Sequence, residues 1–246
     1  RPAAATMLQA VALLLSLGAI AARADIDFKR LHVVDVSPNG RNWIFRSNFP
    51  KVTVNGTGKF AFPNPLLGWM QQRAKEEGGG KPFPAAFTLN DISFDNVLEL
   101  KDIMIEIDYY KTHPSTGNLT FWPLVGQFIP PQDFNETDRS KLANDPATLW
   151  AIDQLPQRLP EIRAKLLDES GPPTVYLWHC EAGCDRTGEF SGAYYMNYAG
   201  LNVSEAFARN TAECGRAPNY WSKNAQAWWC ETRNAEGHDE GNCLSF

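Results

Sequence analysis

Several features are scarce in this chain of 246 residues, and each scarcity excludes a class of protein. Lys and Arg number 23 against 28 Asp and Glu, whereas a nonspecific nucleic-acid binder needs an excess of positive charge. Five cysteines are too few to build a disulfide-held miniature fold of this length. His32, His113 and His238 lie far apart without ligand spacing, so we expect neither a metal nor another cofactor. Hydrophobic residues, by contrast, make up 43% of the chain, which excludes disorder and supplies a core.

Long apolar runs are scarce too. The one candidate, residues 8–22 (LQAVALLLSLGAIAA), has an apolar centre of about a dozen residues, which is short for a membrane span. Ala22-Arg23-Ala24 follows it and matches a signal-peptide cleavage site. We therefore expect residues 1–24 to be upstream sequence and a cleaved signal peptide beginning at Met7. Residues 25–246 would then form one domain, secreted or in the secretory-pathway lumen, with no membrane span. A short anchor or an N-terminal core helix is the alternative.

Four Asn-x-Ser/Thr sequons fit glycosylation in such a compartment: Asn55, Asn118, Asn135 and Asn202. Asn202 also stands three residues before Glu205, the spacing of a helix capping box.

The order of predicted elements indicates an α/β fold. Strands are expected at 31–36, 42–46, within 97–110, within 118–129 and at 174–178, and helices at 65–77, twice within 145–166, and at 189–198. The run 174–178 is short and apolar, as in a buried parallel strand. A terminal helix after Pro218 carries Trp221, Trp228 and Trp229, which we expect to pack into the core rather than to form a partner surface.

Directly after the strand at 174–178 stands the segment His179-Cys180-Glu181-Ala182-Gly183-Cys184-Asp185-Arg186-Thr187-Gly188. Five residues separate Cys180 from Arg186, a CX5R motif. A loop between a strand end and a helix start can turn its N–H groups inward as an anion nest, and the helix dipole adds positive potential. Arg186 offers a planar fork that fits two phosphate oxygens. The same groups favour a thiolate at Cys180, which would lie below the phosphorus as nucleophile.

The remaining loop residues have supporting roles in this interpretation. Glu181, Ala182, Gly183, Cys184, Asp185 and Gly188 would contact the substrate phosphate, with Gly183 allowing the backbone to curl. Thr187 would donate a hydrogen bond to the sulfur when it leaves. His179 would order the loop rather than act as a base, and Asp185 would orient the backbone or Arg186.

This segment resembles the signature of the cysteine-dependent phosphatase superfamily, which includes tyrosine and dual-specificity phosphatases, over about 173–200. Residues 45–50 (FRSNFP) are similar to an early segment of atypical dual-specificity phosphatases. The resemblance implies a central, mostly parallel sheet flanked by helices. It also implies thiolate attack to give a phosphocysteine, then hydrolysis, without a metal.

The start of the loop, His-Cys-Glu-Ala-Gly, is also similar to secreted cysteine phytases, which act on inositol polyphosphates, but Cys184, Asp185 and Gly188 depart from them. Acidic Glu181 and Asp185 near the mouth disfavour a ligand with many phosphates. We therefore expect a phosphotyrosine or related protein phosphoester as substrate, with an inositol polyphosphate as the alternative. A phosphate-binding module without turnover is a rival of another class. The sequence leaves the oligomeric state open.

A general acid is also implied, an upstream Asp in the family. Asp145 lies 35 residues before Cys180 but also suits a helix N-cap before Pro146. Asp133 follows the strand-like run at 121–130, where the family's acid loop would start. Both stay open.

Four cysteines remain besides Cys180, and in a secreted chain they predict two disulfides with three possible pairings. Cys243 lies in a polar tail, 231–246, which a bridge would hold in place. Cys184 has two interpretations: an inert or structurally bridged residue, or a reversible disulfide partner of Cys180.

Overall fold

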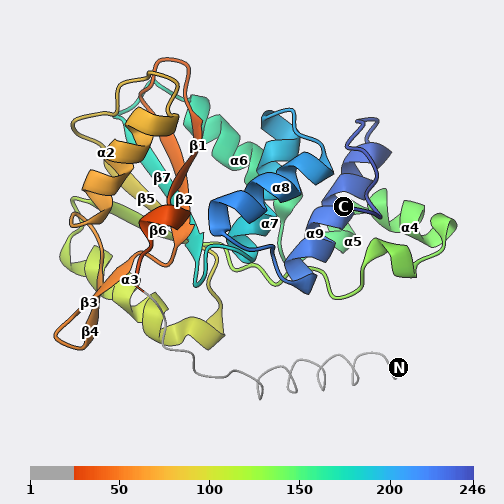
Figure 1. Ribbon diagram of the computed structural model, residues 1–246, viewed down its shortest axis with the longest axis horizontal. Helices are drawn as coiled ribbons and strands as arrows, with labels where there is room; N and C mark the ends of the chain where they lie inside the picture. The colour runs from red at the N-terminus through yellow and green to blue at the C-terminus, as the bar shows by residue number, and fades with distance from the viewer. Residues whose placement is uncertain (1–24) are drawn as a thin grey trace.

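The computed structural model describes residues 25–246, so the predicted signal peptide lies outside the described residues. At its centre is a five-stranded sheet in the order β1-β2-β7-β5-β6 (Figure 1). Its strands are β1 (His32–Val36), β2 (Trp43–Asn48), β5 (Thr88–Ser93), β6 (Gly117–Phe121) and β7 (Thr174–Cys180). β1 is antiparallel to β2, and the other neighbouring strands are parallel. The expected α/β fold with a mostly parallel sheet flanked by helices is confirmed.

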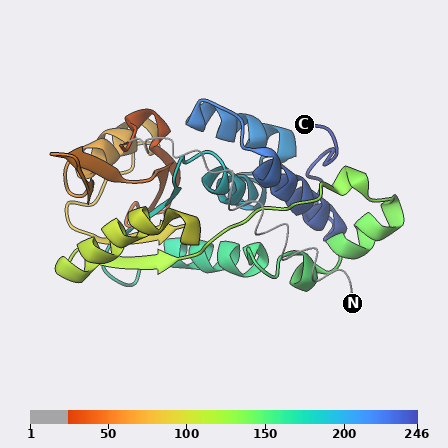
Figure 2. The ribbon, with the colours of Figure 1, turned by 90° about the horizontal axis from the view of Figure 1, so that it is seen from below.

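Helices cover both faces of the sheet. α2 (Leu66–Glu77) and α3 (Leu100–Thr112) pack on one face, and α6 (Leu155–Leu167), α7 (Arg186–Tyr198) and α9 (Tyr220–Ala235) bury apolar residues against the other. α8 (Val203–Cys214) packs on α7, and α4 (Glu136–Ala143) and α5 (Pro146–Leu149) lie at the end away from the sheet (Figures 1 and 2). The smaller elements are a hairpin of β3 (Lys51–Val54) and β4 (Thr57–Phe60), and the 3-10 turns η1 (Phe28–Arg30), η2 (Val97–Glu99) and η3 (Pro131–Asp133).

The elements around the cysteine loop were predicted well. β7 lies between β2 and β5, parallel to both, with every residue after Thr174 buried. Asp145 caps α5, whose first residue is Pro146, so the two-helix interpretation of 145–166 holds. Asn202 forms the expected capping box with Glu205 at the start of α8.

The strands expected within 97–110 are wrong, because this segment forms η2 and α3. Asn96 begins it with a capping box that uses Glu99, and the buried face of α3 carries Asp102, Glu106 and Tyr110. The aliphatic residues face outward instead, among them Val97, Leu98, Leu100, Met104 and Ile107. A helix that buries carboxyl groups and exposes aliphatic side chains gives no normal amphipathic signal, so the β-rich composition misled the prediction.

The strand expected within 118–129 ends early, at Phe121. The chain then runs without regular structure beside α9 toward α4 (Figure 2). Gln127 donates its backbone N–H to the carbonyl of Trp221 over 3.1 Å, and the Trp228 indole donates to the carbonyl of Ile129 over 2.8 Å. These bonds fix the segment 122–130 against α9.

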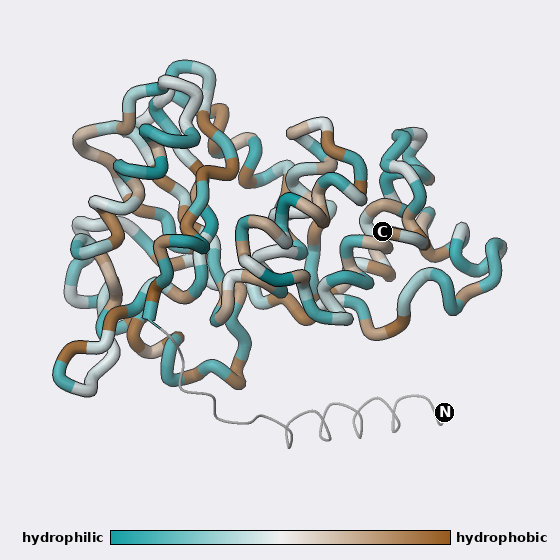
Figure 3. The backbone as a smooth tube through the Cα atoms, in the orientation of Figure 1, coloured by the Kyte–Doolittle hydropathy of each residue, from teal (hydrophilic) through white to brown (hydrophobic). Residues whose placement is uncertain are grey.

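Along the helices the hydropathy changes every few residues (Figure 3), as expected where one side of each helix packs on the sheet. Among residues 25–246, no helix is long and apolar enough to cross a membrane.

Candidate active site

The carboxyl ends of three neighbouring strands meet where the cysteine loop begins. Asn48 of β2 is in register with Cys180 of β7, and Ser93 of β5 is in register with His179. The loop 181–185 follows Cys180 and leads into α7, which starts at Arg186. Ligands of open α/β sheets bind at this edge. Cys180 is a free thiol with 1% of its surface exposed.

The loop backbone has the form of an anion nest. Three successive carbonyl groups are bound from outside the loop: Glu181 by the Phe49 N–H (3.2 Å), Ala182 by Arg30 (2.8 Å) and Gly183 by Arg46 (2.8 Å). Within the described residues, the N–H groups of 182–185 donate to no acceptor. Carbonyls held outward and amides left unpaired are the arrangement that binds an anion.

Arg46 extends this support into the core. Its side chain is fully buried on β2 and forms an ion pair with Glu213 over 2.6 Å, while Asn210 also accepts from it. The sequence indicated Arg46 only through the family resemblance of residues 45–50. The sequence alone does not show that this strand residue pairs with Glu213 on α8.

Arg186 is held at the far end of the loop. Its guanidinium makes two bonds to the Glu99 carboxylate, at 2.9 and 3.2 Å, and donates to the carbonyl of Phe94 at 3.2 Å. Burial alone would lower the pKa of Arg186, but the neighbouring Cys180, Asp95 and Glu99 outweigh it and raise the pKa above its usual range. The guanidinium therefore stays charged and oriented before any substrate binds.

Asp95 is the carboxyl that sequence analysis missed. It follows β5 by two residues, is 1% exposed, accepts from the Glu181 N–H over 3.0 Å and lies 3.4 Å from Arg186 Nη2. Burial raises its pKa to about 6, against the lowering effects of Arg186 and His179. Its position 85 residues before Cys180 gave no local signal.

His179 is fully buried between two acids. Its Nε2 atom lies 3.0 Å from Asp91 Oδ1 and 2.8 Å from Glu106 Oε1. Burial lowers the pKa of His179, but the two carboxyl groups raise it well above the usual value. Burial raises the pKa of Glu106 to about 8. A charged His179 fits the expected ordering role and not that of a base.

The ligand atoms of Asp91, Glu106 and His179 all lie within 4.8 Å of one another, a spacing that can hold a metal ion. Sequence spacing could not reveal this cluster, since its members come from β5, α3 and β7. Because all three are fully buried and both carboxyl groups already contact His179, the cluster is explained as an ion-pair network beside the loop.

Two disulfides are present, Cys184–Cys214 and Cys230–Cys243. The first joins the loop to the end of α8, so it agrees with a structurally bridged Cys184 and leaves Cys180 without that partner. The second anchors the polar tail, as expected.

The other predicted loop residues lie as follows. Asp185 binds Arg216 through both oxygens, at 2.9 and 2.7 Å, and accepts from the Asn219 N–H, so it does not orient Arg186. Thr187 is fully buried, and no residue of the described chain hydrogen-bonds its Oγ1 atom. Gly188 accepts from Asn210 over 2.7 Å.

A cavity of about 500 Å³ opens at Arg186. Its apolar walls are Val97, Leu98, Leu124, Val125, Phe128 and Trp221. Its polar lining includes Glu99, Glu181, Asp185 and Ser222, and Arg186 is the one cation among its lining residues. Trp221 therefore lies at the site with 38% of its surface exposed, whereas Trp228 and Trp229 are buried as expected.

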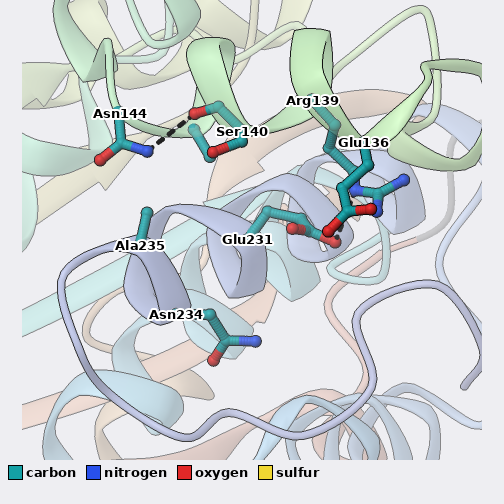
Figure 4. A pocket seen from close by; sticks show the side chains of 8 residues that line it. Glu136, Arg139, Ser140, Asn144, Glu231, Asn234 and Ala235 are labelled. Carbon is teal, nitrogen blue, oxygen red and sulfur yellow. Dashed lines mark hydrogen bonds and ion pairs between the residues drawn. The ribbon is translucent and has the colours of Figure 1, made fainter.

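The two Asp residues suggested as the acid do not line this cavity. Asp145 is exposed and its side chain accepts from the Thr148 N–H as an N-cap, and Asp133 is exposed in η3. A separate cavity of about 230 Å³ lies between α4 and α9 (Figure 4). It is lined by polar residues such as Glu136 and Asn234, and neither Asp residue nor any loop residue belongs to it.

A pair of buried carboxyl groups supports the cavity wall. Asp153 accepts from the Val125 and Gly126 N–H groups, at 2.8 and 3.0 Å. Burial and the neighbouring Asp153 raise the pKa of Glu189, three residues into α7 from Arg186, well above its usual value. The raised pKa favours the protonated form of Glu189 beside Asp153.

No family model and no curated protein matches the sequence. Among solved structures, the chain is similar to TpbA of P. aeruginosa, with a TM-score of 0.39 and 15% identity over 87% of this chain and 94% of that one. It is also similar to a putative protein tyrosine phosphatase from Leishmania major, with a TM-score of 0.32 and 14% identity over 81% of this chain and 96% of that one. Similarity at this level carries no inference about function, which must come from the residues of the site.

Proposed function

We propose that the protein hydrolyses phosphomonoesters through a phosphocysteine formed on Cys180. The observation that carries the proposal is a free, buried cysteine followed by a loop whose N–H groups at 182–185 have no acceptor within the described chain, and whose other end holds an oriented arginine. A phosphoryl group needs these parts: a nucleophile, donors for its oxygens and a fixed positive charge.

In the proposed reaction the Cys180 thiolate attacks phosphorus while the loop amides and Arg186 bind the phosphoryl oxygens. The unpaired Oγ1 of Thr187 is suited to donate to the sulfur when it leaves in the second step. Water then cleaves the S–P bond and releases phosphate. Neither step needs a metal ion.

For the substrate we propose a phosphotyrosine side chain or a related protein phosphoester. Apolar walls such as Phe128 and Trp221 suit an aromatic leaving group, which gains from burial and ring contacts. An inositol polyphosphate carries several phosphates, and Arg186 is the one cation that lines the cavity, beside acidic Glu181 and Asp185.

The two disulfides fit an oxidising compartment, and we propose the secretory lumen or the outside of the cell as its location. Three of the four sequon residues, Asn55, Asn118 and Asn135, are exposed and so accessible to glycosylation.

The test is phosphate release by protein made in a secretory host, with phosphotyrosine peptide and inositol hexakisphosphate compared and Cys180→Ser as control. We expect release from the peptide that disappears in the variant. Preference for inositol hexakisphosphate would replace the substrate class. Binding of phosphate without release from either compound, even after mild reduction, would leave a phosphate-binding module.

A further inference from the structure

The outer face of η2 and α3 carries a row of exposed aliphatic side chains. Val97 is 83% exposed and Leu100 is 59% exposed, and Met104 and Ile107 are exposed as well. These four residues, which we call the aliphatic stripe, follow one another at intervals of three or four positions. That spacing places side chains next to one another on one face of a helix. A contiguous apolar row on the surface marks a place where another molecule binds.

The opposite face of the helix explains why the stripe points to solvent. Three ion pairs hold this opposite face against the sheet and the cysteine loop: Glu99 with Arg186, Asp102 with Lys51, and Glu106 with His179. A rotation of α3 that buried the stripe would break all three pairs and leave buried charges without their partners. The fold therefore keeps the stripe exposed and available for binding.

The stripe leads into the cavity at Arg186. Val97, its first residue, lines that cavity together with Leu98 of the same turn. Four more apolar residues line it from the segment 122–130 and from α9: Leu124, Val125, Phe128 and Trp221. The helix rises about 10 Å from Leu100 to Ile107, the length of about three residues of an extended chain. A peptide whose phosphotyrosine reaches Arg186 can therefore lay its next residues along the stripe.

The charge of the cavity favours apolar over acidic residues beside the phosphotyrosine. Among the described residues that line the cavity, Arg186 is the one cation, and its guanidinium already makes two bonds to Glu99. A phosphate bound there uses this charge, so an Asp or Glu next to the phosphotyrosine would compete with the phosphate for it. Aliphatic side chains instead gain free energy from burial against the apolar walls.

We propose that the aliphatic stripe and the apolar cavity walls bind a protein segment in which bulky aliphatic residues flank the phosphotyrosine within about three positions. The inference rests on the proposed function and narrows its substrates to phosphoproteins with an apolar sequence at the modified site. Because the stripe is continuous with the cavity at Arg186, its occupant is the substrate itself rather than a second copy of this chain or a lipid surface.

The test compares two phosphotyrosine peptides of equal length. They differ only in the three residues on each side of the phosphotyrosine, which are Leu in one peptide and Gln in the other. Leu and Gln are similar in size, so the comparison isolates apolar character. We expect kcat/KM to be higher for the Leu peptide by about 10-fold or more, because burial of one aliphatic side chain contributes about that factor.

The ratio of the two kcat/KM values is then measured for variants, since a ratio within one protein cancels any change in the catalytic groups. In the double variant Leu100→Gln/Met104→Gln most of the preference for the Leu peptide should disappear. Leu167→Gln is the matched control and should keep the full preference. Leu167 is exposed at the end of α6, where the carbonyls of its two neighbours accept from Asn42 just before β2 begins, so it lies at the edge of the sheet away from Cys180.

Binding of both peptides to Cys180→Ser, measured by calorimetry, separates this inference from the proposed function. Tighter binding of the Leu peptide supports the stripe as its docking surface. If the unchanged protein releases no phosphate from either peptide, the proposed function fails, and the binding result still decides the inference. Equal affinities and equal kcat/KM values for the two peptides would overturn the inference and leave the proposed function intact.

Two further results would also overturn it. A preference for the Leu peptide that is unchanged in the double variant would place the apolar recognition elsewhere. Binding to neutral phosphatidylcholine vesicles, or dimer formation in sedimentation, that the double variant loses while it keeps the peptide preference would assign the stripe to a lipid surface or to a second copy of this chain.

Discussion

Replacing Gly183 by Ala tests whether the loop conformation creates the anion site. Gly183 has φ +71°, and a Cβ there would lie 2.6 Å from the Asn48 nitrogen and 2.7 Å from the Ser47 carbonyl oxygen. Both atoms belong to the backbone of β2 in the centre of the sheet, so the loop must move rather than the strand.

The magnitude has two parts. The left-handed backbone costs a non-glycine residue about 1 kcal/mol. Relieving an overlap in a packed interior adds about 1–3 kcal/mol. We expect Gly183→Ala to lower the free energy of unfolding by about 2–4 kcal/mol. A loop displaced by about 1 Å should also lower kcat/KM by about 100-fold.

Gly200→Ala is the matched control, because Gly200 has φ +67° and nothing lies within 4 Å of its added Cβ. It should lose about 1 kcal/mol of stability and keep full turnover. Urea unfolding, binding of inorganic phosphate and kcat/KM with p-nitrophenyl phosphate would be measured for both variants. Normal phosphate binding and turnover in Gly183→Ala would refute the role assigned to this loop.

Three other perturbations separate further parts of the structure. The pKa of Glu189 is raised in the folded chain, so the free energy of unfolding should fall as pH rises from the unfolded to the folded pKa of this carboxyl. Glu189→Gln keeps a hydrogen-bond donor beside Asp153 and should remove this slope of about 1.4 kcal/mol per pH unit, measured by urea unfolding from pH 5 to 8. An unchanged slope would exclude the carboxyl pair. Trp221→Ala should raise KM for an aryl phosphate by about 5–10-fold with little change in kcat, and an unaltered KM would remove Trp221 from the substrate site. Replacing both cysteines of the Cys184–Cys214 bridge by Ser should lower the free energy of unfolding by about 3–4 kcal/mol and also weaken phosphate binding. The same replacement of Cys230–Cys243 should lower stability alone. Equal effects of the two replacements on phosphate binding would argue against a role of the first bridge in holding the loop.

The strand, loop and helix that carry Cys180 and Arg186 were predictable because their signals are local. The apolar run of β7, the spacing in the loop and the start of α7 lie within 25 consecutive residues, Thr174–Tyr198. Asp145, Asn202 and the cysteine-bearing tail were likewise indicated by nearby residues.

What the sequence could not give depends on contacts between distant segments. α3 was mistaken for strands because its buried face carries Asp102 and Glu106, which find Lys51 and His179 only in the folded chain. Asp95 was missed for the same reason, because its partners Arg186 and Glu181 lie far along the sequence.

The most direct test of the central claim is to trap the intermediate. Protein turning over a phosphomonoester would be quenched rapidly, digested and examined by mass spectrometry for the peptide that contains Cys180. The account predicts a phosphoryl group on the Cys180 sulfur during turnover, absent in Cys180→Ser, whose phosphate release is also lost. Phosphate release that continues in Cys180→Ser, with no phosphocysteine in the unchanged protein, would contradict it.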